Sequence, residues 1–389
     1  MVNDKLSDEL LTSCKQGDLS LVELALDKGA NLEARDAQGR TALMLATQKN
    51  HKEMVARLIT AGSDVNARDI TQLTPFICAA ANGFDELIPL MVEGGAELAS
   101  VNRFGGTALL PSSEKGYLKT VELCIEAGVP VNHINDLGWS ALLEAVILGD
   151  GGYLYTDVIR ALVSAGADTH QQDRDRVSSM QHAKNKEQSR VLSILENEQV
   201  AQNEAILQAK LFAKESHLSD AIATIDTALS DNNRSMEELL YYKGYFLQQR
   251  KQFSEAIDAY NQALQSDQSE LQFHFYIANC YRLQKQQDLA LAEFDKAIAL
   301  APTDTFFLYH KSNYLREFGR HEEAVEVMNR LLELKPTRYD FSFHKANSLR
   351  TLGRHQEAID AIENAIANDP TNPLYTTHKA KSVELLQGE

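Results

Sequence analysis

Apolar and polar positions recur at a fixed interval of 34 residues in the second half of the chain. Residues 309–324 read YHKSNYLREFGRHEEA, and residues 343–358 read FHKANSLRTLGRHQEA. Each unit predicts an apolar helix, a turn at Gly319 or Gly353, and a second helix that begins near the Glu-Ala pair. Neither unit can bury its apolar face alone. The period therefore predicts an all-α solenoid, in which stacking of the units supplies the core.

Small residues and prolines keep the same interval from about residue 202 to the end. Alanines mark the start of each predicted second helix, at Ala221, Ala256, Ala290, Ala324 and Ala358. Prolines, which cannot continue a helix, close three of the units. These offsets resemble the tetratricopeptide repeat. The resemblance implies a superhelix of about five repeats plus a capping helix over residues 201–389.

A second period, of 33 residues, runs through the first half of the chain and is kept by Thr41, Thr74, Thr107 and Ser140. The segments RTALMLA, LTPFICAA, GTALLPS and WSALLEA resemble the ankyrin repeat, and GGTALLPSSEKGY and LGWSALLEAVILGDGG resemble a bacterial group of ankyrin proteins. The resemblance implies an ankyrin array of about six repeats over residues 1–200, each first helix capped by Thr or Ser. Pro111 falls inside one such helix, where it is tolerated in the first turn but kinks the helix further in.

The 33-residue step is broken once, because Gly128 and Gly166 are 38 residues apart. The five extra residues fall in LGDGGYLYTD (148–157), between the two predicted helices of their repeat. One interpretation is a longer surface loop. The other is a binding loop, since loops on rigid scaffolds often carry recognition and exposed aromatics such as Tyr153 and Tyr155 are enriched at interfaces.

Apolar residues also mark the expected tips of the hairpins between repeats: Ile70, Phe104, Leu137 and the only tryptophan, Trp139. In ankyrin proteins the tips and inner helices form the partner surface, so the resemblance makes these residues candidate contacts. The alternative is that each tip packs on its neighbour. That alternative fits Trp139 in particular, because an indole ring is costly to leave in water.

The segment 185–207 contains neither Pro nor Gly and carries several apolar residues. A flexible linker would be rich in Gly, Ser or Pro. We therefore expect the last helix of the first array to pack on the first helix of the second, which would make one semi-rigid superhelix of the two.

Side chains three and four residues apart lie on one face of a helix. In tetratricopeptide proteins one such face of the first helices lines the concave groove, and the resemblance places an extended peptide or a partner helix there. The candidate groove residues are Tyr241, Tyr242, Tyr245, Phe275, Tyr276, Asn279, Arg282, Tyr309, His310, Asn313, Arg316, Phe343, His344, Asn347 and Arg350.

The chemistry of these side chains suits a peptide ligand. An Asn amide can both donate to and accept from a peptide backbone, and an Arg three residues later offers a planar fork to a carboxylate. The pattern predicts a groove that favours acidic segments or a free C-terminus, although a solvated helix face would also explain the basic residues. Successive histidines lie about 8–10 Å apart on packed helices, too far to share a metal, but they can make binding depend on pH.

Composition narrows the classes of function. The chain has 389 residues, of which 44% are apolar and 24% charged, which is an ordinary globular mixture. The net charge of −17 argues against nucleic-acid binding, and no stretch predicts a membrane span. The four cysteines are widely separated and fit small core residues better than a zinc site or disulfides. A cytoplasmic protein is expected.

No phosphate-binding loop, HExxH, GxSxG or obvious carboxylate pair is present, so we expect neither enzymatic activity nor a cofactor or metal. The pattern favours a scaffold or adaptor that holds an acidic or C-terminal peptide in the groove and a second protein surface on the ankyrin array. The alternative is a regulatory or host-directed effector that sequesters or inhibits one enzyme. A catalytic site between the arrays is a third, weaker hypothesis.

Overall fold

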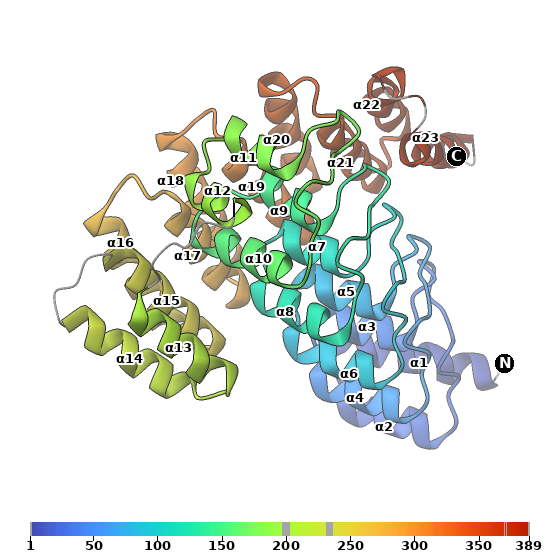
Figure 1. Cartoon of the computed structure of the whole chain (residues 1–389). Coiled ribbons are helices and arrows are strands. Elements are labelled where there is room, and N and C mark those ends of the chain that lie inside the picture. Colours follow the sequence, from blue (N-terminus) through green and yellow to red (C-terminus); the bar gives the residue numbers. More distant parts are fainter. Residues whose placement is uncertain (1, 197–202, 231–235, 369, 371, 388–389) are drawn as a thin grey trace. The chain divides into compact units, whose positions relative to one another are not determined.

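The computed structural model describes residues 2–196, 203–230, 236–368, 370 and 372–387, and it is built from helices (Figure 1). Contacts between residues divide the chain into two units, residues 1–197 and 198–389. The fold is all-α and consists of an ankyrin-type array followed by a tetratricopeptide-type array, which confirms the predicted class. The predicted boundary at residue 200 lies outside the described residues, as does part of the segment expected to join the arrays.

The first unit contains six helix pairs in chain order. They are α1 (Val2–Gln16) with α2 (Leu19–Asp27), α3 (Ala42–Gln48) with α4 (Lys52–Thr60), α5 (Pro75–Asn82) with the 3₁₀ turn η1 (Asp85–Leu87) and α6 (Ile88–Glu93), α7 (Leu109–Glu114) with α8 (Leu118–Ala127), α9 (Ala141–Leu148) with α10 (Tyr153–Ser164), and α11 (Ser179–Asn185) with α12 (Ser189–Leu195). Each first helix packs on the first helices of the neighbouring pairs.

Hydroxyl caps fix the start of four first helices. The side-chain oxygens of Thr41, Thr74, Ser140 and Ser178 accept hydrogen bonds of 3.2–3.4 Å from the backbone N–H three residues later. Thr107 departs from this pattern, because α7 begins only at Leu109 and the buried Thr107 hydroxyl has no partner among the described residues. Pro111 lies in the first turn of α7, where its missing N–H breaks no helical hydrogen bond.

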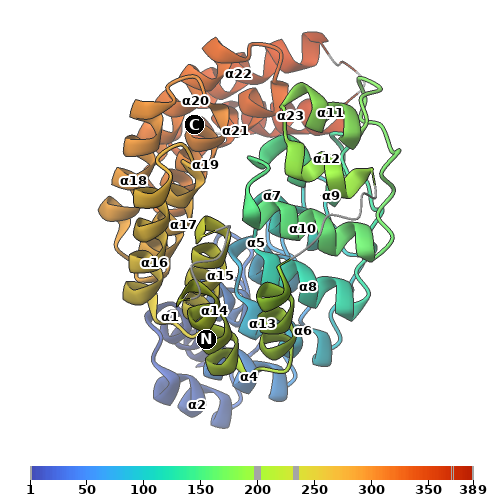
Figure 2. The same cartoon turned by 60° about the vertical axis from the view of Figure 1, so that its left-hand side comes forward.

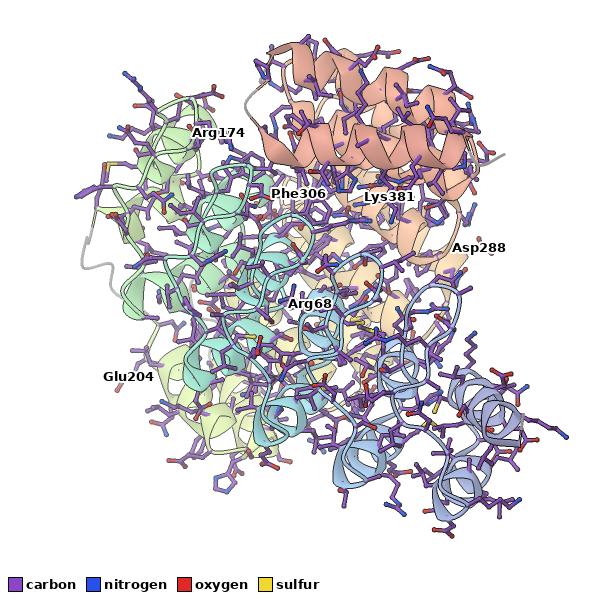
Figure 3. All side chains as sticks on the ribbon, turned by 90° about the vertical axis from the view of Figure 1, so that its right-hand side faces the viewer. Arg68, Arg174, Glu204, Asp288, Phe306 and Lys381 are labelled. Carbon is purple, nitrogen blue, oxygen red and sulfur yellow. The ribbon has the colours of Figure 1, made fainter. Side chains whose placement is uncertain are left out.

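Each hairpin of this unit is built around one Asp or Asn side chain. Its Oδ1 accepts hydrogen bonds of 2.7–3.1 Å from the backbone N–H groups two and four residues later, at Asp36, Asp69, Asn102, Asn135 and Asp173. Neighbouring hairpins are joined in turn, because Arg35 Nη1 donates to the Arg68 carbonyl (2.6 Å) and Arg68 Nη1 to the Val101 carbonyl (2.9 Å). Figure 3 labels Arg68 on this row of hairpins.

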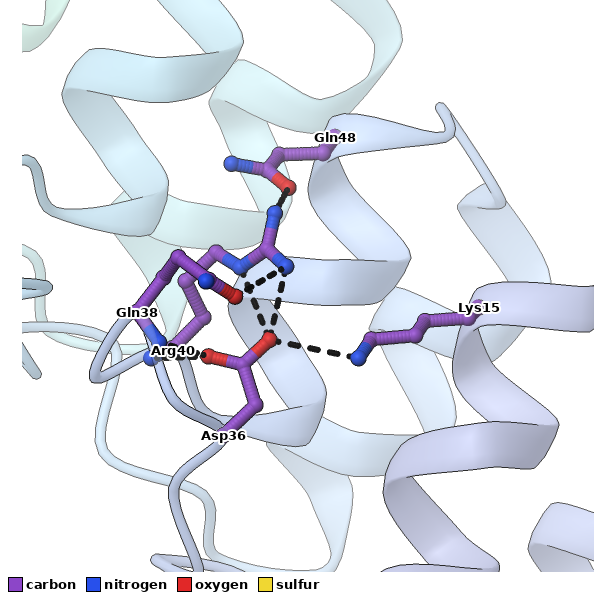
Figure 4. A network of polar contacts seen from close by, with 5 residues as sticks. All are labelled: Lys15, Asp36, Gln38, Arg40 and Gln48. Atoms are coloured by element: carbon purple, nitrogen blue, oxygen red, sulfur yellow. Dashed lines mark hydrogen bonds and ion pairs between the residues drawn. The ribbon is translucent and has the colours of Figure 1, made fainter. Parts of the chain in front are cut away.

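Asp36 also holds the first hairpin against the helices (Figure 4). Its Oδ2 accepts hydrogen bonds from Arg40 Nε (3.0 Å) and Nη2 (2.7 Å) and lies 3.3 Å from Lys15 Nζ on α1. Arg40 Nη1 also donates to Gln48 Oε1 at the end of α3. Burial alone would raise the pKa of Asp36, but hydrogen bonds from Arg40 and Gln38 outweigh it and lower the pKa to about 2.

The insertion at 148–157 does not form a surface loop. The structure therefore corrects both the interpretation as a longer surface loop and the interpretation as a binding loop. Only residues 149–152 separate α9 from α10, and the remaining residues add a turn to the start of α10, which has 12 residues. Tyr155 is fully buried, and its hydroxyl donates to the Glu114 carbonyl at 2.7 Å. Gly149 permits this packing, because a Cβ there would lie 2.4 Å from the Tyr155 ring. Recruitment of an aromatic residue into the core explains why the insertion forms helix.

The second unit contains five helix pairs and a final helix. They are α13 (Glu204–Lys214) with α14 (Leu218–Ser230), α15 (Met236–Gln249) with α16 (Phe253–Ser266), α17 (Gln272–Leu283) with α18 (Gln287–Leu300), α19 (Thr305–Glu317) with α20 (His321–Leu334), α21 (Tyr339–Thr351) with α22 (His355–Asn368), and α23 (Pro373–Gln387). Within this unit α17, α19 and α21 lie on the inner side, and α16, α18, α20 and α22 on the outer side (Figure 2).

Small residues set the close contact between the two helices of a pair. Gly244 on α15 faces Tyr260 on α16, and a Cβ at Gly244 would lie 2.3 Å from that ring. Ala278 and Ser312, at the same position of α17 and α19, are also fully buried. The predicted small position is therefore the point where the first helix meets the second.

Ion pairs at the repeat boundaries reinforce this packing. On the outer helices, Arg320 contacts Glu323 in its own repeat and Asp288 (2.9 Å) in the preceding one, and Arg354 repeats the arrangement with Glu357 and Glu322 (2.9 Å). Asp288 projects from α18 into solvent (Figure 3). The recurrence of these pairs every 34 residues shows that the duplicated sequence motif encodes repeat-to-repeat contacts.

Candidate functional site

Most of the candidate groove residues lie inside the second unit rather than on its surface, which corrects their predicted placement. Ten are buried: Tyr241, Tyr242, Phe275, Tyr276, Arg282, Tyr309, His310, Asn313, Phe343 and Asn347. Five are half-exposed and could meet a ligand: Tyr245, Asn279, Arg316, His344 and Arg350. We call these five residues the inner strip.

Aromatic contacts between repeats explain the burial. A ring on one first helix packs against a ring 35 residues later on the next first helix, which makes a ladder along the stack. The rungs are Tyr241–Tyr276, Phe275–His310, Tyr309–His344 and Phe343–His378, with centroid distances of 5.1, 4.8, 5.8 and 4.5 Å. Because each ring is covered by its partner, the ladder stabilises the stack and offers little area to a peptide.

The polar residues of the inner strip lie where one first helix contacts the next. We call each such contact between successive first helices a joint, and two neighbouring joints are involved. In the α19–α21 joint, Arg316 donates to Asn313 Oδ1 on its own helix and to His344 Nδ1 (3.0 Å) on the next. In the α21–α23 joint, Arg350 donates to Asn347 Oδ1 and to His378 Nδ1 (2.8 Å). The predicted Asn and Arg side chains therefore bind each other first. Their hydrogen bonds fix the direction of each guanidinium group.

These contacts also fix the tautomer of His344. An arginine has only donors, so His344 Nδ1 must accept and the ring proton lies on Nε2. That nitrogen faces the Tyr309 hydroxyl at 3.5 Å. The hydrogen bond from Arg316 therefore requires that the imidazole of His344 is neutral.

The equivalent joint between α17 and α19 is built differently. Arg282 Nε donates to Asn279 Oδ1 (3.1 Å), and Arg282 Nη1 donates to Glu317 Oε1 (3.1 Å) instead of to a histidine. His310, in the position of His344, instead packs between Phe275 and Phe306. This arginine is buried and forms an ion pair, so it is not available to a ligand.

The electrostatic environment of Arg350 differs from that of Arg282. Its hydrogen-bond partners in the described residues are Asn347 Oδ1, His378 Nδ1, the His378 carbonyl (3.2 Å) and Ser382 Oγ (3.5 Å), none of which carries a negative charge. Burial lowers the pKa of the Arg350 guanidinium. Beside it, the amide nitrogen of Asn347 is buried and has no hydrogen-bond partner among the described residues. Of these two residues only Arg350 is half-exposed, and its guanidinium therefore offers a donor that an anion would satisfy.

The predicted ankyrin partner residues differ in exposure. Ile70 is 53% exposed at a hairpin tip, whereas Phe104, Leu137 and Trp139 are half-buried. Tyr153 is half-buried under the guanidinium of Arg190, 4.3 Å from its ring centroid. Tyr155 is buried and does not belong to a partner surface.

Two residues of these surfaces, Ile134 and His378, were not among the candidate site residues taken from the sequence. Ile134, on the hairpin after Phe104, is 49% exposed, and His378 completes the last joint. His378 continues the column of histidines that the period indicates, since it follows His344 by 34 residues, but it was not among the candidate groove residues. Ile134 carried no such signal, because the equivalent position in the preceding repeats is Arg or Val.

Within the described ranges, no group of three or more His, Cys, Asp or Glu side chains is arranged to hold a metal ion. Cys14, Cys78, Cys124 and Cys280 are buried, and burial raises the pKa of each thiol to about 12, as expected for small core residues. None of the helices in the described part of the chain is both long and apolar enough to cross a membrane.

Comparisons with known proteins agree with this architecture. Residues 7–69 and 76–173 match the family model for ankyrin repeats, and residues 206–270, 245–305 and 309–373 match a model for the tetratricopeptide repeat. An ankyrin repeat domain from Acinetobacter baumannii is 40% identical over 48% of this chain and 96% of its own, with a TM-score of 0.48. A second solved ankyrin repeat protein is 33% identical over 49% of this chain and 97% of its own, with a TM-score of 0.48. A search of curated proteins found no match.

Repeats of both families are typically interaction modules for other proteins rather than catalysts. The helix pairs and hairpins of the first unit, and the helix pairs of the second, are what the two family models describe. The chain is thus an ankyrin repeat protein over residues 7–173 that continues into tetratricopeptide repeats over residues 206–373.

Proposed function

We propose that the chain is a non-enzymatic cytoplasmic adaptor that binds an acidic segment or free C-terminus of a protein partner along the inner strip. A second protein surface is held by the ankyrin unit. The proposal deepens the general role of the two repeat families by naming the ligand chemistry and the accessible residues.

The observation that carries the proposal is the environment of Arg350. This half-exposed guanidinium makes its described hydrogen bonds to neutral groups only, and burial lowers its pKa. A carboxylate from a partner would accept from the guanidinium and offset that desolvation. Asn347, one turn away on the same helix, is buried and orients Arg350 by accepting a hydrogen bond from its guanidinium group.

Arg316 repeats the position one unit earlier, so an extended ligand meets two guanidinium groups in succession. The rest of the chain is acidic, with a net charge of −17. A basic strip in such a chain selects acidic segments and repels basic ones. Binding should weaken as salt is added, because half-exposed charges are screened.

On the ankyrin unit we propose a surface centred on the hairpin tips at Ile70, Phe104 and Leu137, with the half-buried Trp139 two residues after Leu137. Ile70 is the most exposed of the four. Tyr153 lies away from these tips at the start of α10 and is covered in part by Arg190. An apolar tip next to polar hairpin loops fits a folded protein surface better than an extended peptide.

The peptide site is tested by fluorescence anisotropy with a labelled octa-aspartate, beside an octa-lysine and an uncharged peptide of the same length. The variant Arg316→Gln with Arg350→Gln removes both accessible guanidinium groups. The matched control is Arg320→Gln with Arg354→Gln, which removes two arginines from the same repeats but on the outer helices.

We expect the wild-type chain to bind only the acidic peptide and the inner double variant to lose roughly tenfold or more in affinity, as for two charge-assisted contacts of about 1 kcal/mol each. The outer control should bind like the wild type. Equal affinity in all three proteins, or preference for the lysine peptide, contradicts the proposed site. Melting temperatures of all variants separate lost contacts from lost folding.

A further inference from the structure

The two Arg–His joints have a property beyond ligand binding, because both depend on the charge state of a histidine. Arg316 Nη1 donates to His344 Nδ1 at 3.0 Å, and Arg350 Nη2 donates to His378 Nδ1 at 2.8 Å. A proton on either Nδ1 removes the only acceptor of that hydrogen bond and sets two cations face to face. The joint and the imidazolium therefore exclude each other.

We propose that the α19–α21 and α21–α23 joints form an acid-sensitive switch, in which protonation of His344 and His378 releases Arg316 and Arg350 to bind an acidic ligand more tightly. The proposal rests on the proposed function for its ligand. The hydrogen bonds that it invokes do not depend on that function.

The groups around His344 determine the direction of the switch. From α19 it meets the Arg316 guanidinium and the Tyr309 hydroxyl. From α20, His321 lies close enough to Arg316 that burial and this guanidinium together lower the pKa of His321. On α22, Glu357 is paired with Arg354 and interacts with Lys345, which follows His344 on α21. The charged group in contact with His344 is thus the Arg316 guanidinium, and a bound anion beside it would favour the protonated imidazole.

The groups around His378 are similar. From α21 it meets Arg350 and the face of Phe343, whose ring centroid lies 4.5 Å away. From α22, Glu363 approaches α23, but it is paired with Lys379 at 2.8 Å. That carboxylate is therefore already engaged. The main response to a proton on His378 is displacement of the Arg350 guanidinium.

The joint between α17 and α19 provides an internal contrast. There Arg282 pairs with Glu317, so no imidazole faces the guanidinium group. Mild acid should therefore leave the Arg282–Glu317 contact intact, while the Arg–His hydrogen bonds of the next two joints break. The response is expected at the C-terminal repeats of the unit rather than along its whole length.

The test measures affinity for the labelled octa-aspartate at pH 7.5 and 5.5, where aspartate stays ionised in both buffers. We expect the wild-type chain to bind roughly fivefold tighter at pH 5.5, the effect of two added half-exposed charge pairs. His344→Asn with His378→Asn keeps a side-chain acceptor but cannot be protonated, so its affinity should not change with pH. His217→Asn, at an exposed histidine, is the control and should respond like the wild type.

A second readout does not require the ligand. Long-range ¹H–¹⁵N spectra of the full chain at pH 7.5 should show His344 and His378 protonated on Nε2, with both nitrogens protonated at pH 5.5. A proton on Nδ1 at pH 7.5, or wild-type affinity that does not rise in acid, overturns the switch. A chain that binds the peptide at neither pH contradicts the proposed function, and the spectra then decide the switch by themselves.

Discussion

The hydroxyl of Tyr155 donates a 2.7 Å hydrogen bond to the carbonyl oxygen of Glu114, one repeat earlier in the ankyrin unit. The ring itself is fully buried. This contact ties the residues that interrupt the 33-residue step to the preceding repeat. It assigns them a role in stability rather than in recognition.

Tyr155→Phe should lower the free energy of unfolding of the ankyrin unit by about 1 kcal/mol, because it removes one buried hydrogen bond and keeps the ring. Trp139 is the only tryptophan in the chain, so its fluorescence reports unfolding of this unit alone in urea. Tyr153→Phe, at a half-exposed ring, should cost less. A larger loss at Tyr153 than at Tyr155 would contradict this assignment.

Asp36 should make the ankyrin unit sensitive to acid. Its pKa is lowered from 3.8 to about 2 in the folded chain, so the contribution is complete above pH 3.8 and disappears as the pH falls towards 2. We expect a loss of about 1–2 kcal/mol across that window. Urea unfolding followed through Trp139 should show a smaller loss in Asp36→Asn. The exposed Asp27→Asn serves as the control and should keep the wild-type slope.

Gly244→Ala should destabilise the tetratricopeptide unit despite the better helix propensity of alanine. The propensity gain is at most about 1 kcal/mol, whereas overpacking against a ring costs about 1–3 kcal/mol. The new Cβ would lie 2.3 Å from the Tyr260 ring. Thermal unfolding by circular dichroism checks this prediction. Adding Tyr260→Leu should restore part of the loss, and an unchanged or raised melting temperature in Gly244→Ala would show that the contact relaxes.

The tetratricopeptide unit should also lose stability in mild acid. Burial and Arg316 lower the pKa of His321 below its ordinary 6.5, so the folded chain favours the neutral ring. Its contribution is complete above pH 6.5 and is lost as the pH falls below that value. Hydrogen exchange of α19–α21 should therefore accelerate between pH 7 and 5.5, after correction for the intrinsic rate. His321→Gln should reduce this effect, and His217→Gln should not.

Much of the fold could be predicted from spacing alone. The 33-residue and 34-residue periods located the helix pairs because a repeated unit must present the same apolar face to each neighbour. The positions of Thr41, Thr74 and Ser140 predicted three helix starts, since a capping hydroxyl acts within three residues of itself. Thr107 did not follow the rule, and that repeat begins its helix two residues later.

The site could be predicted less well, because exposure depends on the neighbouring repeat. Phe275 and Asn313 lie on the face that the period indicates, yet both are covered by groups from their own or the next helix. Helical spacing gives the direction of a side chain but not the partner that meets it. The same limitation applied to Tyr155, whose burial depends on a contact with a residue 41 positions away.

The aromatic ladder has a consequence for how such a chain tolerates damage. Each rung joins only adjacent modules, from Tyr241–Tyr276 to Phe343–His378. Loss of one aromatic contact therefore leaves the contacts of the flanking repeats intact. The array would separate at that interface while the repeats on either side stay folded. For the same reason, a whole repeat could be added or removed between two rungs while the other ring contacts are kept. The length of the array could therefore change without new packing in the core.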